Sequence, residues 1–473
     1  MTSNDVLEIF KKITTIPRES GHEEQMVAWL QSWAEENSFE FKKDAVGNVC
    51  ISKPASKGKE NIPVIVLQAH QDMVCEKLPS SSHDFTSDPV SYVIEDGWMV
   101  AHDTTLGADD GIGIAAALAL LLDPTPKGRV ECLFTISEET DMNGAENLQA
   151  GFISGKTLIN LDSEDEGQIF IGCSGGLNTR IEFNLEFAAP SSGLKAVELH
   201  IENGIGGHSG DDINKDRMNT LQQLCRFLYH EQSFGLELCS ICGGGKANAI
   251  ARDAKAVILV RDSEATAERF ARFGQTIHQE FHNTDPDVTC RCDCTETPVK
   301  VIASRQATAI LSALYACPHG MQAMSQDVPG LVQTSTNLAA VRMSDDKLEV
   351  ITSQRSPAPS ERHMIADKVA AVFELAGAKT EKLLEYPGWE PNPDSLILKR
   401  CVESYRKLFG TDPEIKAIHA GLECGMFLTK FPELDMISFG PTLRGVHAPG
   451  EKLELASLDK FNALLEDLVN NFE

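Results

Sequence analysis

The sequence has little positive charge. Among its 473 residues, 42 are Lys or Arg and 70 are Asp or Glu, which gives a formal net charge of −28. Nucleic acids and anionic membranes would have to approach a repulsive field, so neither is expected as the main partner. We expect most of the acidic residues to form solvated surface and a few to gather as ligands for a cation.

Long hydrophobic runs are also missing. The longest, Ile112–Leu122, is about half of the ~20 residues that a bilayer span requires. The first ten residues are polar and lack the basic and apolar regions of a secretory signal. With 42% apolar and 24% charged residues, the composition is that of a soluble globular protein. The sequence therefore predicts a cytoplasmic protein.

The cysteines do not form a disulfide framework. They number 13, an odd and scattered set, which is not the pattern of a disulfide-stabilised fold. Two clusters, Cys239-x-x-Cys242 and the alternating Cys290, Cys292 and Cys294, lack the spaced partners of a zinc knot. We expect reduced, partly buried thiols at these positions.

The first part of the chain alternates helical and strand patterns. Two amphipathic helices are expected before residue 37, the first capped by Asn4 or Asp5. Short apolar runs of strand length follow, and Ala108–Leu122 is apolar enough to be a buried helix. This succession favours an α/β domain with a largely parallel sheet flanked by helices. The expected strands are Asn48–Ser52, Pro63–Ala69, Val130–Ile136 and Thr157–Leu161, and the other helices are Glu23–Glu36 and Glu139–Gln149.

From about residue 175 the pattern changes to an α+β arrangement. Its strands alternate polar and apolar residues, as in an antiparallel sheet with one solvated face. Gly and Pro crowd Tyr386–Pro393, which is typical of a linker. Before this linker, the expected strands are 178–185, 195–201, 254–260 and 347–352, and the expected helices are 214–231, 263–280 and 359–376. After it we expect a helix at 395–409, strands at 414–418 and 435–439, and a final helix at 457–472.

His70 and Asp72 follow directly after the strand expected at 63–69. In an extended chain residues 70 and 72 point to the same side. His70 is therefore a candidate metal ligand, and Asp72 a candidate to orient its imidazole. Taken alone, the pattern is more typical of a surface loop.

Asp109 and Asp110 stand between glycines just before the apolar helix. Either acid is a candidate metal ligand, and a helix cap is the commoner role at this position. A phosphate-binding loop is excluded because the third glycine of a dinucleotide fingerprint and the Lys-Ser/Thr of a P-loop are missing. Two adjacent acids would also repel an anion.

Further acids follow the next two expected strands. Glu138 and Glu139 come after 130–136, and Asp162 comes after 157–161. Adjacent acids can divide the work, one binding a metal while the other takes up and returns a proton. A solvated turn is the commoner explanation for each pair alone.

The four segments together point to a cation site. Open α/β sheets build their sites at the carboxyl ends of the strands. Divalent cations prefer carboxylate oxygen and imidazole nitrogen, and two ions bridged by one carboxylate would use such a set. His447, after the strand expected at 435–439, offers a further ligand.

These residues lie in motifs that resemble one family over nearly the whole chain. It is the family of dinuclear zinc aminopeptidases and carboxypeptidases that includes peptidase T, carboxypeptidase G, aminoacylase and carnosinase, and the resemblance is strongest to its bacterial dipeptidases. The motifs are AHQDMVCEK, LGADDGIG, ISEETDMNGAENL, LDSEDEG, GGHSGDDI, IHAGLECG and GPTLRGVHAPGE.

The resemblance implies a role for each candidate. His70 and Asp162 would bind one metal, and Glu139 and His447 the other. Asp109 would bridge the two ions, with Asp110 as the alternative. Asp72 would orient His70, and Glu138 would act as the general base and then as the acid. Zinc is the expected metal, and Co or Mn would substitute for it.

The resemblance also implies an inserted lid. The catalytic domain would comprise residues 1–186 and 391–473, interrupted by an α+β lid at 187–390 that mediates homodimerisation. His208 would stabilise the developing oxyanion, often across the dimer. Asn248 would lie near the substrate carboxylate, and Arg355 would pair with it.

The activity implied is hydrolysis of unblocked dipeptides, especially aminoacyl-histidine. A related deacylase that uses the same centre on N-acyl amino acids is the alternative within the family. A non-catalytic metal-binding or acidic interaction protein is the alternative outside it, and it would not need the Glu138-Glu139 pair. Glu423 is a candidate for recognising the substrate's free amine or, alternatively, a solvated turn acid.

Overall fold

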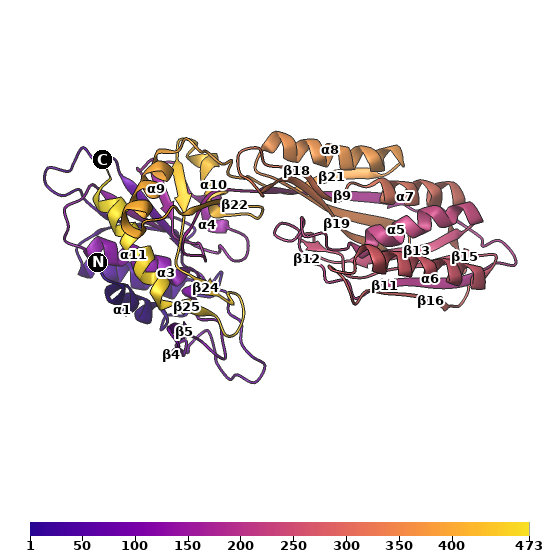
Figure 1. The fold of residues 1–473 in the computed structure, drawn as a ribbon, viewed down its shortest axis with the longest axis horizontal. Coiled ribbons are helices and arrows are strands. Elements are labelled where there is room, and N and C mark those ends of the chain that lie inside the picture. The colour runs from indigo at the N-terminus through magenta and orange to yellow at the C-terminus, as the bar shows by residue number, and fades with distance from the viewer. Residues whose placement is uncertain (473) are drawn as a thin grey trace. The chain divides into compact units, whose positions relative to one another are not determined.

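The computed structural model describes residues 1–472. The chain forms two compact units, each with its own hydrophobic core. The first unit comprises Met1–Gly172, Trp389–Ala417 and the residues from Leu422 onward. The second comprises Cys173–Gly388 and Ile418–Gly421. In Figure 1 the second unit runs from magenta to orange, and the first is indigo and purple at its start and orange to yellow from Trp389 onward.

An eight-stranded sheet forms the centre of the first unit, in the order β1-β2-β6-β3-β7-β23-β8-β22. The four strands β6, β3, β7 and β23 are parallel to one another, whereas β1, β2 and β8 pair antiparallel. β3 and β6 are buried along their whole length, as expected for parallel strands covered on both faces. The strands are β1 (Glu40–Lys43), β2 (Val49–Lys53), β3 (Ile65–His70), β6 (Val130–Thr135), β7 (Thr157–Asn160), β8 (Gln168–Cys173), β22 (Glu414–Ile418) and β23 (Asp435–Ser438).

Seven helices and a small sheet complete the described part of this unit. The apolar helix α3 packs against β3 and α1, and α11 packs against α9 and α1. The small sheet has the order β24-β25-β5-β4. These elements are α1 (Ser3–Ile13), α2 (Glu24–Glu36), α3 (Ala108–Leu122), α4 (Asn143–Asn147), α9 (Leu396–Phe409), α10 (Glu423–Lys430), α11 (Leu455–Asn470), β4 (Val93–Glu95), β5 (Trp98–Val100), β24 (Leu443–Arg444) and β25 (Lys452–Glu454).

The second unit is built on a nine-stranded antiparallel sheet. Its order is β16-β11-β15-β13-β19-β20-β9-β21, with β18 paired to β19. The strands are β9 (Gly175–Asn184), β11 (Lys195–Glu202), β13 (Glu237–Gly244), β15 (Ala254–Val260), β16 (Thr289–Cys294), β18 (Gly320–Met324), β19 (Val332–Met343), β20 (Lys347–Ser356) and β21 (Lys379–Tyr386).

Helices and two short ribbons accompany this sheet. α8 packs against β9 and α5 against β11, and α5 and α7 pack against each other. The ribbons are β10 with β17 and β12 with β14. These elements are α5 (Thr220–Glu231), a 3₁₀ turn η1 (Gln232–Phe234), α6 (Ser263–Glu280), α7 (Ser304–Ala316), α8 (Pro359–Leu375), β10 (Phe187–Ala188), β12 (Gly207–His208), β14 (Ala249–Ile250) and β17 (Val301–Ile302).

The predicted α/β class, with a mixed sheet and an α+β segment, is confirmed. Helix α3 has the predicted bounds. The first helix is capped by Thr2, whose side chain accepts from the Asp5 N–H, and not by Asn4 or Asp5. Helix α5 begins at Thr220, after the N-cap Asn219, and not at residue 214.

The second unit begins earlier than the lid boundary predicted at residue 187. Strand β9 pairs with β20 and β21 of the nine-stranded sheet, so Gly175–Asn184 belongs with that sheet. Cys239, Cys242, Cys290, Cys292 and Cys294 are free thiols. None of the helices in residues 1–472 combines the length and the apolar character that crossing a bilayer requires.

Candidate metal centre

The candidate ligands of the first unit stand where its central strands end. His70 is the last residue of β3, Glu138 and Glu139 follow β6, and Asp162 follows β7. Asp109 lies in the first turn of α3. Parallel strands bring their carboxyl ends to one edge of a sheet, and that edge gathers these side chains.

The ligand atoms fall into groups that share Asp109. His70, Asp109 and Asp162 form one group, and Asp109, Glu139 and His447 form another. His70 Nε2 lies 2.9 Å from Asp109 Oδ1 and 3.5 Å from Asp162 Oδ1. His447 Nε2 lies 3.2 Å from Asp109 Oδ2 and 3.0 Å from Glu139 Oε2. The two oxygens of Asp109 therefore face different groups, which is the geometry of a bridging carboxylate.

A third group, His70 with Glu138 and Glu139, puts Glu138 beside the same centre. Burial raises the pKa of Glu138 well above its usual value. The charge of His70 opposes this rise, and the charges of Asp162, Glu423 and Glu139 reinforce it. A carboxyl group with a raised pKa beside candidate ligands can both take up and return a proton.

Asp110 turns away from this centre. Its Oδ2 accepts from the His70 N–H at 3.3 Å, and its Oδ1 accepts from the Gly113 N–H at 3.1 Å. The peptide bond between Asp109 and Asp110 is cis. Within residues 1–472, Asp110 joins none of the ligand groups, whereas Asp109 joins two of them.

Asp72 holds both His70 and the turn that follows β6. Its Oδ1 lies 3.3 Å from His70 Nδ1 and accepts from the Glu138 N–H at 3.1 Å. Its Oδ2 accepts from Ser20 Oγ at 2.7 Å and from the Glu139 N–H at 3.2 Å. Although burial opposes the change, hydrogen bonds from His70, Ser20 and Glu138 lower the pKa of Asp72 to about 2. An ionised Asp72 beside Nδ1 favours a His70 ring that carries a proton on Nδ1.

Two buried charges hold the backbone around Asp109. The Arg18 guanidinium donates to the carbonyls of Gln71, Asp72 and Gly107. The Glu451 carboxylate accepts from four consecutive N–H groups of residues 106–109, at 2.7–3.3 Å. Each of these side chains is only 2% exposed. Glu451 lies four residues after His447, so one loop contributes a candidate ligand and the cap of α3.

The protonation of the two histidines reflects the surrounding carboxylates. Hydrogen bonds to Asp109 and Glu139 raise the pKa of His447 to about 11. Burial opposes the charged form of His70, but Asp162 and Asp109 hold its pKa well above the usual value. A protonated histidine here substitutes for the positive charge that a metal ion would bring.

The donor set fits divalent cations. It consists of imidazole nitrogens and carboxylate oxygens, the ligands of zinc and related ions. Glu139 Oε1 is buried and has no hydrogen-bond partner among the described residues. A buried, unpaired carboxylate oxygen is costly unless a cation or a proton satisfies it.

Glu423 occupies a position that sequence reasoning did not anticipate. It is 1% exposed, so it is not a solvated turn acid. Its Oε2 accepts from Gln68 Nε2 at 2.7 Å and from Thr135 Oγ1 at 2.8 Å. Gln68, a polar residue inside a buried strand, is the sequence signal that could have pointed to this partner.

The second unit brings its three candidate residues together. His208 in β12 pairs with Ala249 in β14, directly after Asn248. Arg355 Nη2 lies 3.4 Å from His208 Nε2, and Arg355 Nη1 donates to Tyr386 Oη at 2.8 Å. Asn248 is exposed, and its carbonyl accepts from the Ser209 N–H. Tyr386 was not among the predicted residues.

Arg355 is a buried cation whose charge helps to lower the pKa of Asp211. It is 5% exposed, and no carboxylate of residues 1–472 forms an ion pair with it. Buried cations are normally paired, so this guanidinium is suited to an external anion.

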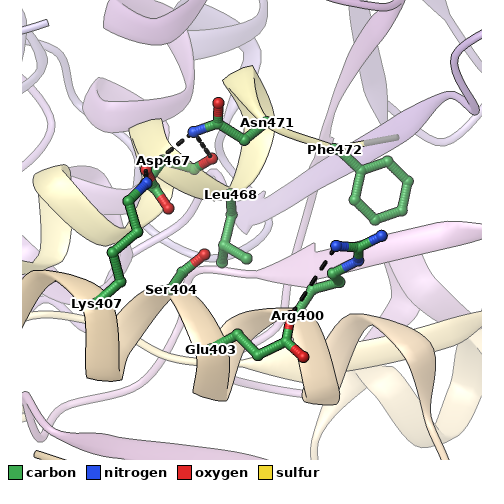
Figure 2. A pocket seen from close by; sticks show the side chains of 8 residues that line it. All are labelled: Arg400, Glu403, Ser404, Lys407, Asp467, Leu468, Asn471 and Phe472. Atoms are coloured by element: carbon green, nitrogen blue, oxygen red, sulfur yellow. Dashed lines mark hydrogen bonds and ion pairs between the residues drawn. The ribbon is translucent and has the colours of Figure 1, made fainter.

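A pocket between α9 and α11 is a weaker candidate site (Figure 2). It has a volume of about 170 Å³, and its charged side chains face one another. Lys407 Nζ lies 2.6 Å from Asp467 Oδ1, and Arg400 Nη1 lies 3.9 Å from Glu403 Oε2. These charges cancel within the pocket.

Comparison with known proteins assigns the chain to a family. The model of peptidase family M20/M25/M40 matches residues 66–471. The chain belongs to this family. A cytosol non-specific dipeptidase of Escherichia coli (strain K12) is 37% identical over 466 residues, which cover 98% of this chain and 96% of that protein.

Solved structures of the family agree with the fold. The crystal structure of aminoacylhistidine dipeptidase from Vibrio alginolyticus matches with a TM-score of 0.92 and 37% identity, over 99% of this chain and 96% of that one. Aminopeptidase PepT from Bacillus cereus matches with a TM-score of 0.65 and 14% identity, over 99% and 98% of the chains. At that identity the second match shows the fold alone.

Proposed function

We propose that this protein is a dinuclear-metal dipeptidase that hydrolyses unblocked dipeptides, especially aminoacyl-histidine. The observation that carries the proposal is the Asp109 carboxylate, whose two oxygens face separate groups of candidate ligands. The names of the two relatives at 37% identity, a non-specific dipeptidase and an aminoacylhistidine dipeptidase, support the substrate class.

Two divalent ions would be held by five residues. His70 and Asp162 would bind one, Glu139 and His447 would bind the other, and Asp109 would contribute a carboxylate oxygen to each. We propose Zn²⁺, for which Co²⁺ or Mn²⁺ can substitute. When bound, such ions supply Lewis acidity, which makes water more acidic and polarises a carbonyl group.

Glu138 transfers the protons of the reaction. It takes a proton from the attacking water and returns it to the departing amine nitrogen. The pKa of Glu138, which burial raises, suits both steps. Asp72 acts by position, because it holds His70 through Nδ1 and the backbone of residues 138 and 139.

The second unit supplies the proposed substrate contacts. Arg355, buried and without a carboxylate partner, pairs with the carboxylate of the dipeptide. Asn248 contacts the same carboxylate, and His208 donates to the carbonyl oxygen as negative charge develops on it. Recognition of a free carboxylate close to the scissile bond favours dipeptides over long chains.

We further propose that the second unit acts as a lid and as the surface of a homodimer, and that the protein works in the cytoplasm. The E. coli relative is named a cytosol dipeptidase. Light scattering or analytical ultracentrifugation tests the dimer.

A dipeptide panel assayed on metal-stripped and metal-restored protein tests the function. We expect no turnover after stripping, recovery with Zn²⁺, Mn²⁺ or Co²⁺, and release of amino acids from Xaa-His dipeptides. N-acyl amino acids are the matched alternative substrates. Faster hydrolysis of these would make the protein a deacylase, and absence of turnover on both would remove the enzymatic proposal.

A further inference from the structure

A row of polar side chains crosses the buried parallel strands of the first unit. Gln68 of β3, Asn160 of β7 and Ser438 of β23 are in register on neighbouring strands. Asn160 Nδ2 donates to Gln68 Oε1 at 2.6 Å, and Ser438 Oγ donates to Asn160 Oδ1. Gln68 Nε2 also donates to Thr135 Oγ1 of β6 at 3.2 Å. One polar side chain from each parallel strand therefore joins the row.

Glu423 ends this row and is its only ionisable member. Its Oε2 accepts from both Gln68 and Thr135, and its Oε1 is buried without a partner in residues 1–472. It is the first residue of α10, far from both donors in sequence. The row thus ties the C-terminal part of the first unit to its central strands.

The row lies just behind the candidate ligands. Gln68 precedes His70 by two residues, and Asn160 precedes Asp162 by two. The Asp162 N–H donates to Asn160 Oδ1 at 3.4 Å. Thr135 is the last residue of β6, directly before the turn that carries Glu138 and Glu139.

Buried polar groups at these positions need a reason, because parallel strands covered on both faces are normally apolar. The five side chains of the row are each at most 1% exposed: Gln68, Thr135, Asn160, Glu423 and Ser438. An apolar row would avoid the cost of desolvating amides, hydroxyls and a carboxylate. Directional hydrogen bonds, unlike apolar contacts, fix the rotamers and the lateral spacing of neighbouring strands.

We propose that Glu423 is a positioning residue of the metal centre. It fixes Gln68 and Thr135, and through this row it sets the relative positions of His70, Asp162 and the Glu138–Glu139 turn. The expected effect of Glu423 on catalysis rests on the proposed function. Its expected effect on metal affinity does not depend on which substrate is cleaved.

Two substitutions of Glu423 separate positioning from charge. Glu423→Gln keeps an acceptor oxygen for both donors, whereas Glu423→Leu has a similar size and no acceptor. We expect Glu423→Leu to weaken Zn²⁺ binding to the stripped protein by about 10–100-fold and to lower kcat more than it changes KM. Glu423→Gln should retain both values within about threefold, because its oxygen can satisfy Gln68 and Thr135.

Competition titration with a zinc-binding dye measures the affinity, and dipeptide kinetics measure kcat and KM. Thr135→Val removes one donor from the row with almost no change in shape, so it tests the row even if Glu423→Leu fails to fold. We expect a several-fold loss of Zn²⁺ affinity in this variant.

Two results would overturn the proposal. Equal losses in the Gln and Leu variants would show that the charge of Glu423 matters, as in amine recognition or proton transfer. If Glu423→Leu binds Zn²⁺ as tightly as the wild type, the row does not position the ligands. If Glu423→Leu does not fold, unchanged Zn²⁺ affinity in Thr135→Val would show the same. An inactive wild-type protein would count against the proposed function alone, since the Zn²⁺ titrations would still be interpretable.

Discussion

Asp109 and Asp110 are adjacent and chemically identical, yet the backbone gives them opposite surroundings. Asp109 faces two histidines, and its pKa is lowered: burial opposes the change, but hydrogen bonds with His447 and His70 outweigh it. Asp110 faces backbone N–H groups, and burial raises its pKa well above the usual value. The position of each carboxylate, and not the type of residue, decides which one can bind a cation.

Matched Asn variants of these two residues test that difference. Asp109→Asn removes one oxygen and the charge that both ligand groups share. We therefore expect Zn²⁺ affinity to fall by more than about 100-fold, which is more than the loss usually seen when a residue that only supports a metal ligand is replaced. Asp110→Asn keeps an acceptor oxygen for the N–H of His70 or of Gly113, and we expect its Zn²⁺ affinity to fall by less than about tenfold. Metal content after dialysis measures both. A larger loss in Asp110→Asn would make Asp110 the bridging residue.

Glu138 should separate catalysis from metal binding. Glu138→Gln keeps the size of the side chain but cannot accept a proton, so we expect kcat to fall by roughly 10²–10⁴-fold. The Zn²⁺ content should stay at the wild-type level, because the two ligand groups that share Asp109 do not include Glu138. Steady-state dipeptide kinetics together with metal analysis check both expectations. Wild-type turnover in this variant would require another general base.

At the scale of elements, the sequence predicts best where one local signal decides the structure. The uninterrupted apolar stretch at 108–122 predicts α3 with its observed bounds. By contrast, the first half of β19 is rich in polar residues that are buried in the folded unit, and the sequence prediction omits this strand. The sequence prediction also omits helix α7.

The candidate site likewise contains residues that local sequence identifies and residues that it does not. Strand ends and adjacent acids identify Asp72, Glu138 and Asp162 as candidates from local sequence. His447 is separated from them by the whole second unit; its place after the strand expected at 435–439 makes it a candidate, and only the family resemblance assigns it to one metal ion. The polar row that ends at Glu423 could not be predicted, because its hydrogen bonds depend on the register between strands that are distant in sequence.

His319 provides a pH test of how one helix is held. Its Nδ1 accepts from the Leu338 N–H at 3.2 Å and lies 3.5 Å from Nδ2 of Asn219, the N-cap of α5. Burial lowers the pKa of His319 to about 4, so the folded protein keeps this ring neutral. The unfolded chain takes up the proton near pH 6.5. The stabilising effect is therefore present above pH 6.5 and is lost as the pH falls toward 4.

We expect acidification from pH 7 to 4.5 to cost the second unit roughly 2–3 kcal/mol through this group. His319→Asn keeps an acceptor close to the Nδ1 position and cannot ionise in this range, so it should lose less stability on acidification than the wild type. Urea unfolding of both proteins at the two pH values measures the difference. Equal pH dependence in both would exclude His319 as the cause.

At the scale of the whole molecule, the two units have separate cores. The core of the first unit contains no residue of the second unit's core, and every candidate ligand lies in the first unit. The acidic net charge of −28 disfavours the compact state through self-repulsion. Bound cations would reduce this repulsion only where the carboxylates gather, in the first unit.

Metal removal should therefore affect the two units unequally. A ligand that binds only the folded state stabilises it, by about 2.7 kcal/mol at a concentration 100 times its Kd. We expect calorimetry to resolve two unfolding transitions and a chelator to lower the midpoint of one of them. Asp109→Asn should show the low midpoint with or without Zn²⁺, while the other transition stays fixed. Equal shifts of both transitions would mean that metal binding in the first unit also stabilises the second, so that the two units unfold as one cooperative body.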